Sequence, residues 1–140
     1  MSGKQDGYVY FRNRMSSSVL QADERYVSIK RPSKIGSQLW APDYLHHGKV
    51  KIVTKSNEFK VLDMEGTTYG SKIITAQDVG PEKETQYWHI GYHGDIVNAK
   101  TGLCISIPQT NNSYPYGLEV VGHYFHGGDW QRFTIEHVDY

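Results

Sequence analysis

The pattern Gln-x-aromatic occurs three times in this sequence, as Gln38-Leu39-Trp40, Gln86-Tyr87-Trp88 and Gln131-Arg132-Phe133. Gln86 lies 48 residues after Gln38, and Gln131 lies 45 residues after Gln86, so each interval is close to one third of the 140-residue chain. Self-similarity at a period of about 20 to 50 residues is typical of proteins built from several copies of one supersecondary unit. We therefore predict one domain over residues 1–140, made of three units with bounds of about 7–48, 49–94 and 95–138.

The residues around each pattern repeat as well. An apolar pair at the start of a strand precedes each one: Val19-Leu20, Val61-Leu62 and Cys104-Ile105. A large aromatic side chain at the same place in each unit supplies volume for a shared core. The glutamine two residues earlier points to the other side of the strand or turn, where its amide can hold loop backbone. We therefore interpret six residues as structural: Gln38, Trp40, Gln86, Trp88, Gln131 and Phe133.

The rest of the chain has the pattern of strands and turns. Short runs of β-branched, aromatic and other apolar residues predict strands at 8–11, 26–29, 50–53, 72–75 and 132–135. Clusters of Gly, Asn, Ser and Thr predict turns at 65–70 and 110–113. Apolar residues rarely recur at helical spacing. We therefore predict an all-β domain of about a dozen short strands.

Charge and cysteine content exclude several classes of protein. Lys plus Arg and Asp plus Glu each number 15, so the formal net charge is zero, which argues against nucleic acid as a partner. The basic stretch 30–34 is either a solvated loop or a local nucleic-acid patch, and its shortness favours the loop. Cys104 is the only cysteine, so the chain forms no internal disulfide, and its apolar neighbours favour a buried thiol.

The titratable residues do not form a recognisable reaction centre. The seven histidines have no Cys partners at zinc spacing, so we expect neither a metal nor another cofactor. Asp63 and Glu65 share a strand face, but nothing nearby in the sequence would raise the pKa of either carboxyl group. We therefore expect no enzymatic activity.

The N-terminal residues contain no apolar stretch typical of a secretory signal, and no run approaches the roughly 18 apolar residues of a membrane span. We therefore expect a soluble protein that does not insert into membranes. It is either cytoplasmic or exported by a route that the sequence does not reveal.

As a set, the three patterns resemble those of the R-type, or ricin-B-like, β-trefoil lectins over about residues 7–138. The match is best in the second unit, at 61–66, 70–75 and 86–88, while the third unit has a His-Gly-Gly segment at 126–128 before its pattern. It looks closest to invertebrate galactose-binding members such as the earthworm tandem-repeat lectin. The resemblance implies a β-trefoil of three four-stranded units. Six strands would form a barrel and six a hairpin cap, with one potential sugar pocket per unit.

The resemblance also implies which side chains contact a sugar. Members of the family use an Asp after the apolar pair, an aromatic in the later strand or loop, and an Asn before the motif Gln. In the second unit Asp63 stands at the Asp position and Thr85 at the Asn position, while Gln77 and Asp78 add polar contacts. The aromatic position falls near Ala76. The alternative role of Asp63 is to cap the following turn.

The other two units depart further from the family pattern. In the third unit Ser106 replaces the Asp, His123 and Tyr124 lie at the aromatic position, Trp130 replaces the Asn, and His126 is near. These aromatic residues either line a pocket or pack against the cap. In the first unit Gln21 and Ser37 replace the Asp and Asn, Tyr26 or Lys30 is a candidate to line a cleft, and the alternative is a subunit interface.

The function that the resemblance implies is non-catalytic recognition of galactose or N-acetylgalactosamine on cell-surface glycans or glycolipids. Single sugar sites are typically weak, so several sites per chain or a homodimer would supply avidity. The alternative is a β-trefoil scaffold that binds a protein, as cytoskeletal cross-linkers or protease inhibitors of this architecture do. The loss of the Asp in two units favours this alternative.

Overall fold

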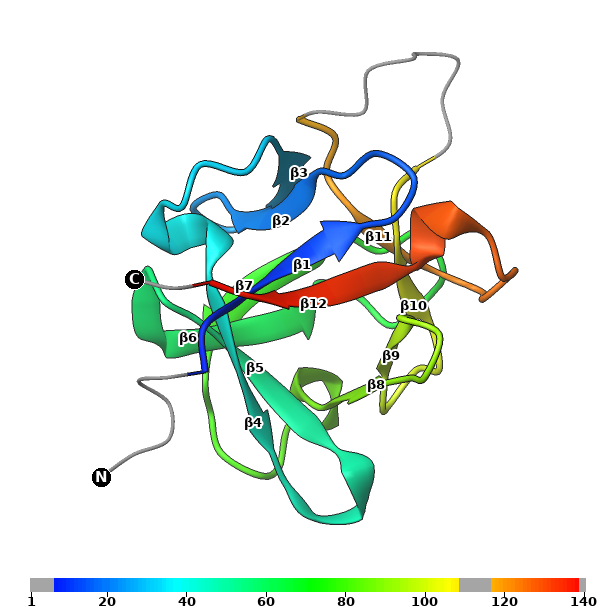
Figure 1. Cartoon of the computed structure of the whole chain (residues 1–140). Helices are drawn as coiled ribbons and strands as arrows, with labels where there is room; N and C mark the ends of the chain where they lie inside the picture. Colours follow the sequence, from blue (N-terminus) through cyan, green and yellow to red (C-terminus); the bar gives the residue numbers. More distant parts are fainter. Residues whose placement is uncertain (1–6, 109–116, 139–140) are drawn as a thin grey trace.

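The computed structural model describes residues 7–108 and 117–138, which form strands and short 3-10 turns (Figure 1). The strands are β1 (Val9–Asn13), β2 (Val19–Ala22), β3 (Val27–Lys30), β4 (Trp40–Tyr44), β5 (Val50–Thr54), β6 (Asn57–Met64), β7 (Ile73–Gln77), β8 (Trp88–Ile90), β9 (Ile96–Asn98), β10 (Cys104–Ser106), β11 (Val121–His123) and β12 (Phe133–His137). The 3-10 turns are η2 (Gly36–Gln38), η3 (His46–Gly48), η4 (Glu84–Gln86) and η5 (Asp129–Gln131). The all-β prediction is confirmed. The turn expected at 65–70 joins β6 to β7, whereas the one expected at 110–113 lies outside the described residues.

Six strands make up the barrel. Antiparallel ladders join them in the order β12, β1, β4, β5, β8 and β9. No ladder pairs β9 with β12 within the described ranges; instead the Phe133 N–H donates to the Gly94 carbonyl across this seam at 2.8 Å. Gly94 has a φ of +87°, and a Cβ there would overlap the Phe133 backbone, so the seam requires glycine.

The other six strands form three hairpins, β2–β3, β6–β7 and β10–β11, which make the cap. Isolated bridges join each hairpin to the other two: Tyr26 to Ile74, Lys72 to Val121, and Ser28 to Glu119. The cap is therefore triangular, and each unit contributes one corner of it. Together with the barrel it gives the β-trefoil arrangement of four strands per unit.

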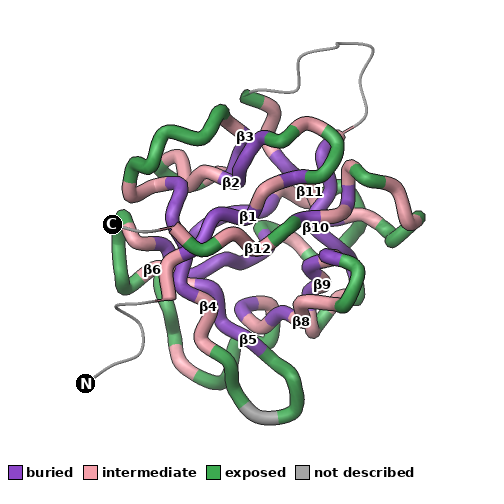
Figure 2. The backbone as a smooth tube through the Cα atoms, viewed as in Figure 1, coloured by how far each residue is buried: buried purple, intermediate pink, exposed green. Residues whose placement is uncertain are grey.

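The main apolar core draws side chains from all three units. Figure 2 marks the buried residues along the backbone. Trp40, Trp88 and Phe133 each begin a barrel strand and are at most 2% exposed. The Trp40 indole N–H donates to the Leu20 carbonyl at 3.1 Å, and the Trp88 indole N–H donates to the Leu62 carbonyl at 3.0 Å. These bonds satisfy the buried indoles and tie the barrel to two cap hairpins.

Within residues 7–108 and 117–138, no helix has the length and apolar composition needed to cross a membrane. The same residues contain no group of three or more His, Cys, Asp or Glu side chains arranged to hold a metal ion. Cys104 is buried, and its burial raises the pKa of the thiol.

Candidate functional site

Each motif glutamine holds the loop that follows the second strand of its cap hairpin. Gln38, Gln86 and Gln131 are at most 1% exposed, and each ends a 3-10 turn. Their side-chain carbonyls accept from backbone N–H groups at Ser33 (2.7 Å), Val79 (3.3 Å) and His126 (2.6 Å). Their amide groups donate to backbone carbonyls at Arg31 (2.8 Å), Gln77 (2.8 Å) and Tyr124 (2.6 Å). The same clamp thus shapes an equivalent loop in each unit.

Each clamp amide also donates to the side chain that follows the apolar pair. The acceptors are Gln21 (3.0 Å), Asp63 (3.2 Å) and Ser106 (3.0 Å). These three residues therefore occupy equivalent positions beside the clamped loops. What distinguishes the units is the chemistry at this position and the side chains that surround it.

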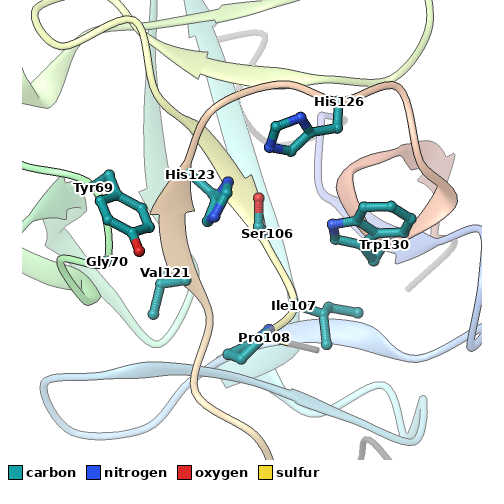
Figure 3. Close-up of a pocket in the computed structure, with 9 residues that line it drawn as sticks. All are labelled: Tyr69, Gly70, Ser106, Ile107, Pro108, Val121, His123, His126 and Trp130. Carbon is teal, nitrogen blue, oxygen red and sulfur yellow. The ribbon is translucent and has the colours of Figure 1, made fainter. Parts of the chain in front are cut away.

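In the third unit, Ser106 and the side chains around its clamped loop border a cavity of about 490 Å³ (Figure 3). The structure brings together four of the predicted residues on its wall: Ser106, His123, His126 and Trp130. The ring centroids of His123 and His126 lie 5.2 Å apart. The fifth predicted residue of this unit, Tyr124, lies beside the cavity with its ring 6.1 Å from that of His123.

Tyr69, from the loop between β6 and β7 of the second unit, completes this wall. Its ring lies 5.0 Å from His123 in an edge-to-face arrangement and stacks on Tyr124 at 5.9 Å. Two backbone bonds hold the loop against β11: Gly70 N–H to the Gly122 carbonyl (2.8 Å) and Gly122 N–H to the Ser71 carbonyl (2.9 Å). The sequence patterns did not place Tyr69 at this cavity, because contact between units depends on the packing of the cap.

Trp130 forms the opposite wall and takes its position from the His-Gly-Gly segment. A Cβ on Gly128 would overlap the Trp130 ring, so the ring lies directly against the Gly128 backbone. Trp130 is half-buried and packs against the core, and its carbonyl accepts from the Ile107 N–H at 3.1 Å. This residue therefore serves both as packing and as a face of the cavity.

In the second unit, the predicted residues make bonds within the chain. Asp63 is fully buried: its carboxylate accepts from the Met64 N–H (2.7 Å) and the Gln86 amide (3.2 Å), and it pairs with Lys83 at 2.6 Å. The Lys83 side chain is 46% exposed, so its ammonium lies between the Asp63 carboxylate and solvent. A ligand reaches Asp63 only when Lys83 moves away, and sugar contact by Asp63 stays a prediction.

The loop after β7 is held separately. Asp78 pairs with Lys51 at 2.6 Å, and the Lys51 ammonium also donates to the Gly80 carbonyl at 2.9 Å. Gln77 is exposed, and the buried Thr85 hydroxyl has no hydrogen-bond partner in the described part of the chain. None of these residues, nor Asp63, lines the third-unit cavity, and their roles as sugar contacts remain predictions.

The candidate residues of the first unit also form hydrogen bonds within the chain. The Gln21 amide donates to Asp23 at 2.7 Å while its carbonyl accepts from Gln38, and Asp23 also accepts from the Ser28 hydroxyl at 2.5 Å. The Tyr26 hydroxyl donates to Glu65 of the second unit at 3.0 Å. Gln21 therefore serves the packing of its own unit.

No protein-family model and no curated protein matches this sequence. Solved structures do match: a designed threefold symmetric protein, ThreeFoil, is 23% identical with a TM-score of 0.84, over 95% of this chain and 100% of that one. The C-terminal half of the earthworm R-type lectin, solved with GalNAc, is 19% identical with a TM-score of 0.73, over 94% and 99%. The chain has the β-trefoil fold.

A third match of this kind is the ricin B-like lectin of Macrolepiota procera, solved in complex with lactose. It is 15% identical with a TM-score of 0.78, over 95% of this chain and 96% of that one. At these identities the likeness shows the fold alone. Function in this β-trefoil depends on its own residues, because one fold hosts many functions.

Proposed function

We propose that this β-trefoil is a non-catalytic carbohydrate-binding module and that the third-unit cavity is its working sugar site. The observation that carries this proposal is the convergence of Ser106, His123, His126 and Trp130 with Tyr69 of the neighbouring unit around one cavity. Its volume of about 490 Å³ lies within the range of about 300–1,000 Å³ typical of small-molecule sites.

The side chains of this cavity suit a saccharide. A pyranose ring presents an apolar C–H face and a rim of hydroxyls, so it needs both a flat apolar surface and hydrogen-bonding groups. Tyr69 and Trp130 supply aromatic surfaces on opposite sides, and the stacked Tyr124 extends the first of them. Ser106 and the two histidines supply polar atoms between these surfaces.

The comparisons support a galactose-type ligand. The earthworm lectin was solved with GalNAc and the Macrolepiota procera lectin with lactose. We therefore propose glycans or glycolipids that end in galactose or N-acetylgalactosamine as the partners. Recognition of this kind needs no cofactor. A homodimer remains our prediction for how a single weak site gains avidity.

A glycan array with multivalently displayed protein tests the proposal. We expect wild-type protein to bind galactose-terminated glycans, and Tyr69→Ala and Tyr124→Ala each to weaken binding at least about tenfold by removing stacking surface. Tyr44→Ala is the matched control, because Tyr44 is 65% exposed, close to the 59% of Tyr69 and 60% of Tyr124, yet lies on β4. A blank array from folded protein would contradict the proposal.

The second candidate is a scaffold that binds a protein partner. Gln21 and Asp63 favour this candidate, because in two of the three units the residue after the apolar pair is bonded to other groups of the chain. A blank array together with protein capture that survives added sugar would support this candidate.

A further inference from the structure

Two imidazoles border the third-unit cavity. His123 ends β11 and His126 lies in the clamped loop before η5, and Figure 3 shows His123 between Tyr69 and Ser106. The His123 Nδ1 atom lies 3.2 Å from the Tyr124 carbonyl oxygen. Because a carbonyl oxygen only accepts, Nδ1 carries the hydrogen, and Nε2 is the ring atom that changes from acceptor to donor on protonation.

The side chains that border the cavity include no carboxylate within the described part of the chain. Where the second unit has Asp63, the third has Ser106, whose hydroxyl already accepts from the Gln131 amide at 3.0 Å. Neutral sugar hydroxyls are held best by a carboxylate that accepts from two of them at once. A single engaged serine hydroxyl is a weaker acceptor, so this cavity is poorly equipped for an entirely neutral sugar.

The groups that the structure shows in contact with His123 are rings and a thiol, while the Asp95 carboxylate lies near enough to Cys104 to add to burial in raising the pKa of its thiol. Tyr69 and Tyr124 face His123 as rings, and beneath it the Cys104 thiol donates to the His123 carbonyl at 3.2 Å; burial keeps that thiol protonated. On the neighbouring hairpin edge Lys72 pairs with Glu119 at 3.1 Å, which cancels both charges.

Two further charged groups lie on the elements beside His126. The Arg132 guanidinium lies 6.0 Å from the Phe125 ring centroid, which places a cation beside the clamped loop. Asp129 begins η5 and is exposed to solvent, and its carbonyl accepts from the Asn13 amide at 3.0 Å. Arg132 and Asp129 therefore carry opposite charges on these elements, and neither side chain borders the cavity.

We infer that the third-unit cavity selects a galactose-type saccharide that bears an anionic group, a sulfate or a carboxylate, and binds it more tightly at mildly acidic pH. This inference rests on the proposed function and adds the class of sugar. Protonated imidazoles donate charge-assisted hydrogen bonds to sulfate or carboxylate oxygens, which are about twice as strong as neutral ones.

The sign of the pH effect follows from linkage. Histidine ordinarily titrates near about pH 6.5, and a bound anion favours the protonated ring. Binding therefore takes up a proton: affinity is greatest at low pH and falls as pH rises through the histidine range. The His123 and His126 rings lie 5.2 Å apart, so an anion between them would offset the repulsion between two protonated rings.

The test compares lactose, lactose sulfated on galactose, and galacturonic acid, each immobilised at equal density, at pH 5.5 and pH 8.0 and constant ionic strength. We expect each acidic probe to bind at least about tenfold more tightly than lactose at pH 5.5, and this advantage to fall about tenfold at pH 8.0. His123→Gln and His126→Gln should each reduce the advantage and flatten its pH dependence. His93→Gln is the matched control, because His93 is exposed in the turn between β8 and β9.

A second variant adds to the cavity the carboxylate that it lacks. Ser106→Asp places a carboxylate where Asp63 accepts from its own clamp glutamine in the second unit, so the clamp can accommodate it. We expect this variant to lose the preference for acidic probes and to gain affinity for lactose. Should the buried charge prevent folding, the two histidine variants carry the test alone.

The outcomes separate the inference from the proposed function. Equal binding of lactose and the acidic probes, or an acidic preference unchanged by pH and by both histidine variants, would overturn the inference and leave sugar binding intact. Binding of none of the three probes at either pH would contradict both.

Discussion

Three buried glutamines each hold an equivalent loop in this molecule. Their hydrogen bonds explain why the spacing of the sequence pattern reveals the three units. Each glutamine side chain accepts a hydrogen bond from one backbone N–H of its loop and donates one to a backbone carbonyl of the same loop. Without the glutamine, these two backbone groups would lack a partner. The requirement recurs wherever the loop recurs. The residue type therefore repeats in the sequence even where the ligand-facing side chains do not.

Gln86→Ala should lower the free energy of unfolding by about 3 kcal/mol, because it leaves the Val79 N–H, the Gln77 carbonyl and one Asp63 contact without a partner. Urea denaturation followed by circular dichroism measures the change. Gln77→Ala is the control, since that side chain is exposed, and it should stay within about 0.5 kcal/mol of wild type. Equal stability of the two variants would show that the clamp contributes little.

Asp63→Ala should destabilise the fold by about 1–3 kcal/mol, because the Gln86 amide and the Lys83 ammonium lose their buried acceptor. Its binding to glycans should stay at the wild-type level, because the third-unit cavity does not include Asp63. Thermal unfolding and a glycan array on the same preparation separate the two effects. Loss of binding by a folded variant would place a working site in the second unit instead.

At the scale of elements, β1 and β12 close the chain on itself through a five-pair antiparallel ladder. Arg12 on β1 donates two hydrogen bonds to the Glu136 carboxylate on β12, at 2.7 and 3.1 Å. The hydrogen bond from Arg12 lowers the pKa of Glu136. Because the folded pKa lies below the unfolded one, the pair stabilises the fold above the unfolded value, and this contribution is lost as pH falls through the folded value.

Glu136→Gln should therefore cost about 0.5 kcal/mol at pH 7, a small figure because both side chains are partly exposed and screened by solvent. The difference from wild type should shrink as pH falls below the ordinary glutamate value of about 4.3, and it should vanish below the lowered folded value. Urea titrations at pH 7 and at pH 3 measure both values. A difference that grew toward low pH would contradict the assigned sign.

Gly128→Ala tests how the loop before η5 shapes the cavity. Gly128 has a φ of −80°, which alanine adopts without strain, so the effect is the overlap of its Cβ with the Trp130 ring. We expect the ring to move, glycan binding to fall at least about tenfold, and stability to fall by about 1–3 kcal/mol. Gly36→Ala is the control, because a Cβ there makes only ordinary contacts at 3.9 Å.

The local sequence predicted where strands lie, but it did not predict their exact first and last residues. The run 132–135 predicted a strand that begins one residue too early, because the Arg132 N–H donates to the Asp129 carbonyl and still belongs to the turn of η5. The run 50–53 was closer: β5 begins at Val50 as predicted and ends one residue later. Periodicity thus locates strands, while hydrogen bonds to turns set where they end.

The candidate site was predictable only within each unit. The alignment of units placed Ser106, His123 and Trp130 together, because they follow the same internal landmarks. It did not place Tyr69 in the third-unit cavity, nor Lys83 over Asp63, because both contacts depend on how separate loops meet in three dimensions. These contacts determine what surrounds Ser106 and Asp63.

At the scale of the whole molecule, the three units share one core but differ in their side chains around the clamped loops. The core aromatics Trp40, Trp88 and Phe133 occupy equivalent barrel positions, whereas Gln21, Asp63 and Ser106 give the three clamps different chemistry. A threefold frame can thus keep its packing while its clamped loops differ, and we propose that the third-unit cavity is the working site.

The most direct test of this central claim is a proton–nitrogen NMR titration of the intact protein with the tightest-binding saccharide of the array. The protein has three tryptophans, and the indoles of Trp40 and Trp88 are buried and bonded to backbone carbonyls in the core. We predict that among the three indole signals only that of Trp130 moves, together with the amides of Ser106, His123 and His126. Movement centred on Asp63 and Trp88, or no movement at saturating sugar, would contradict a working site in the third unit.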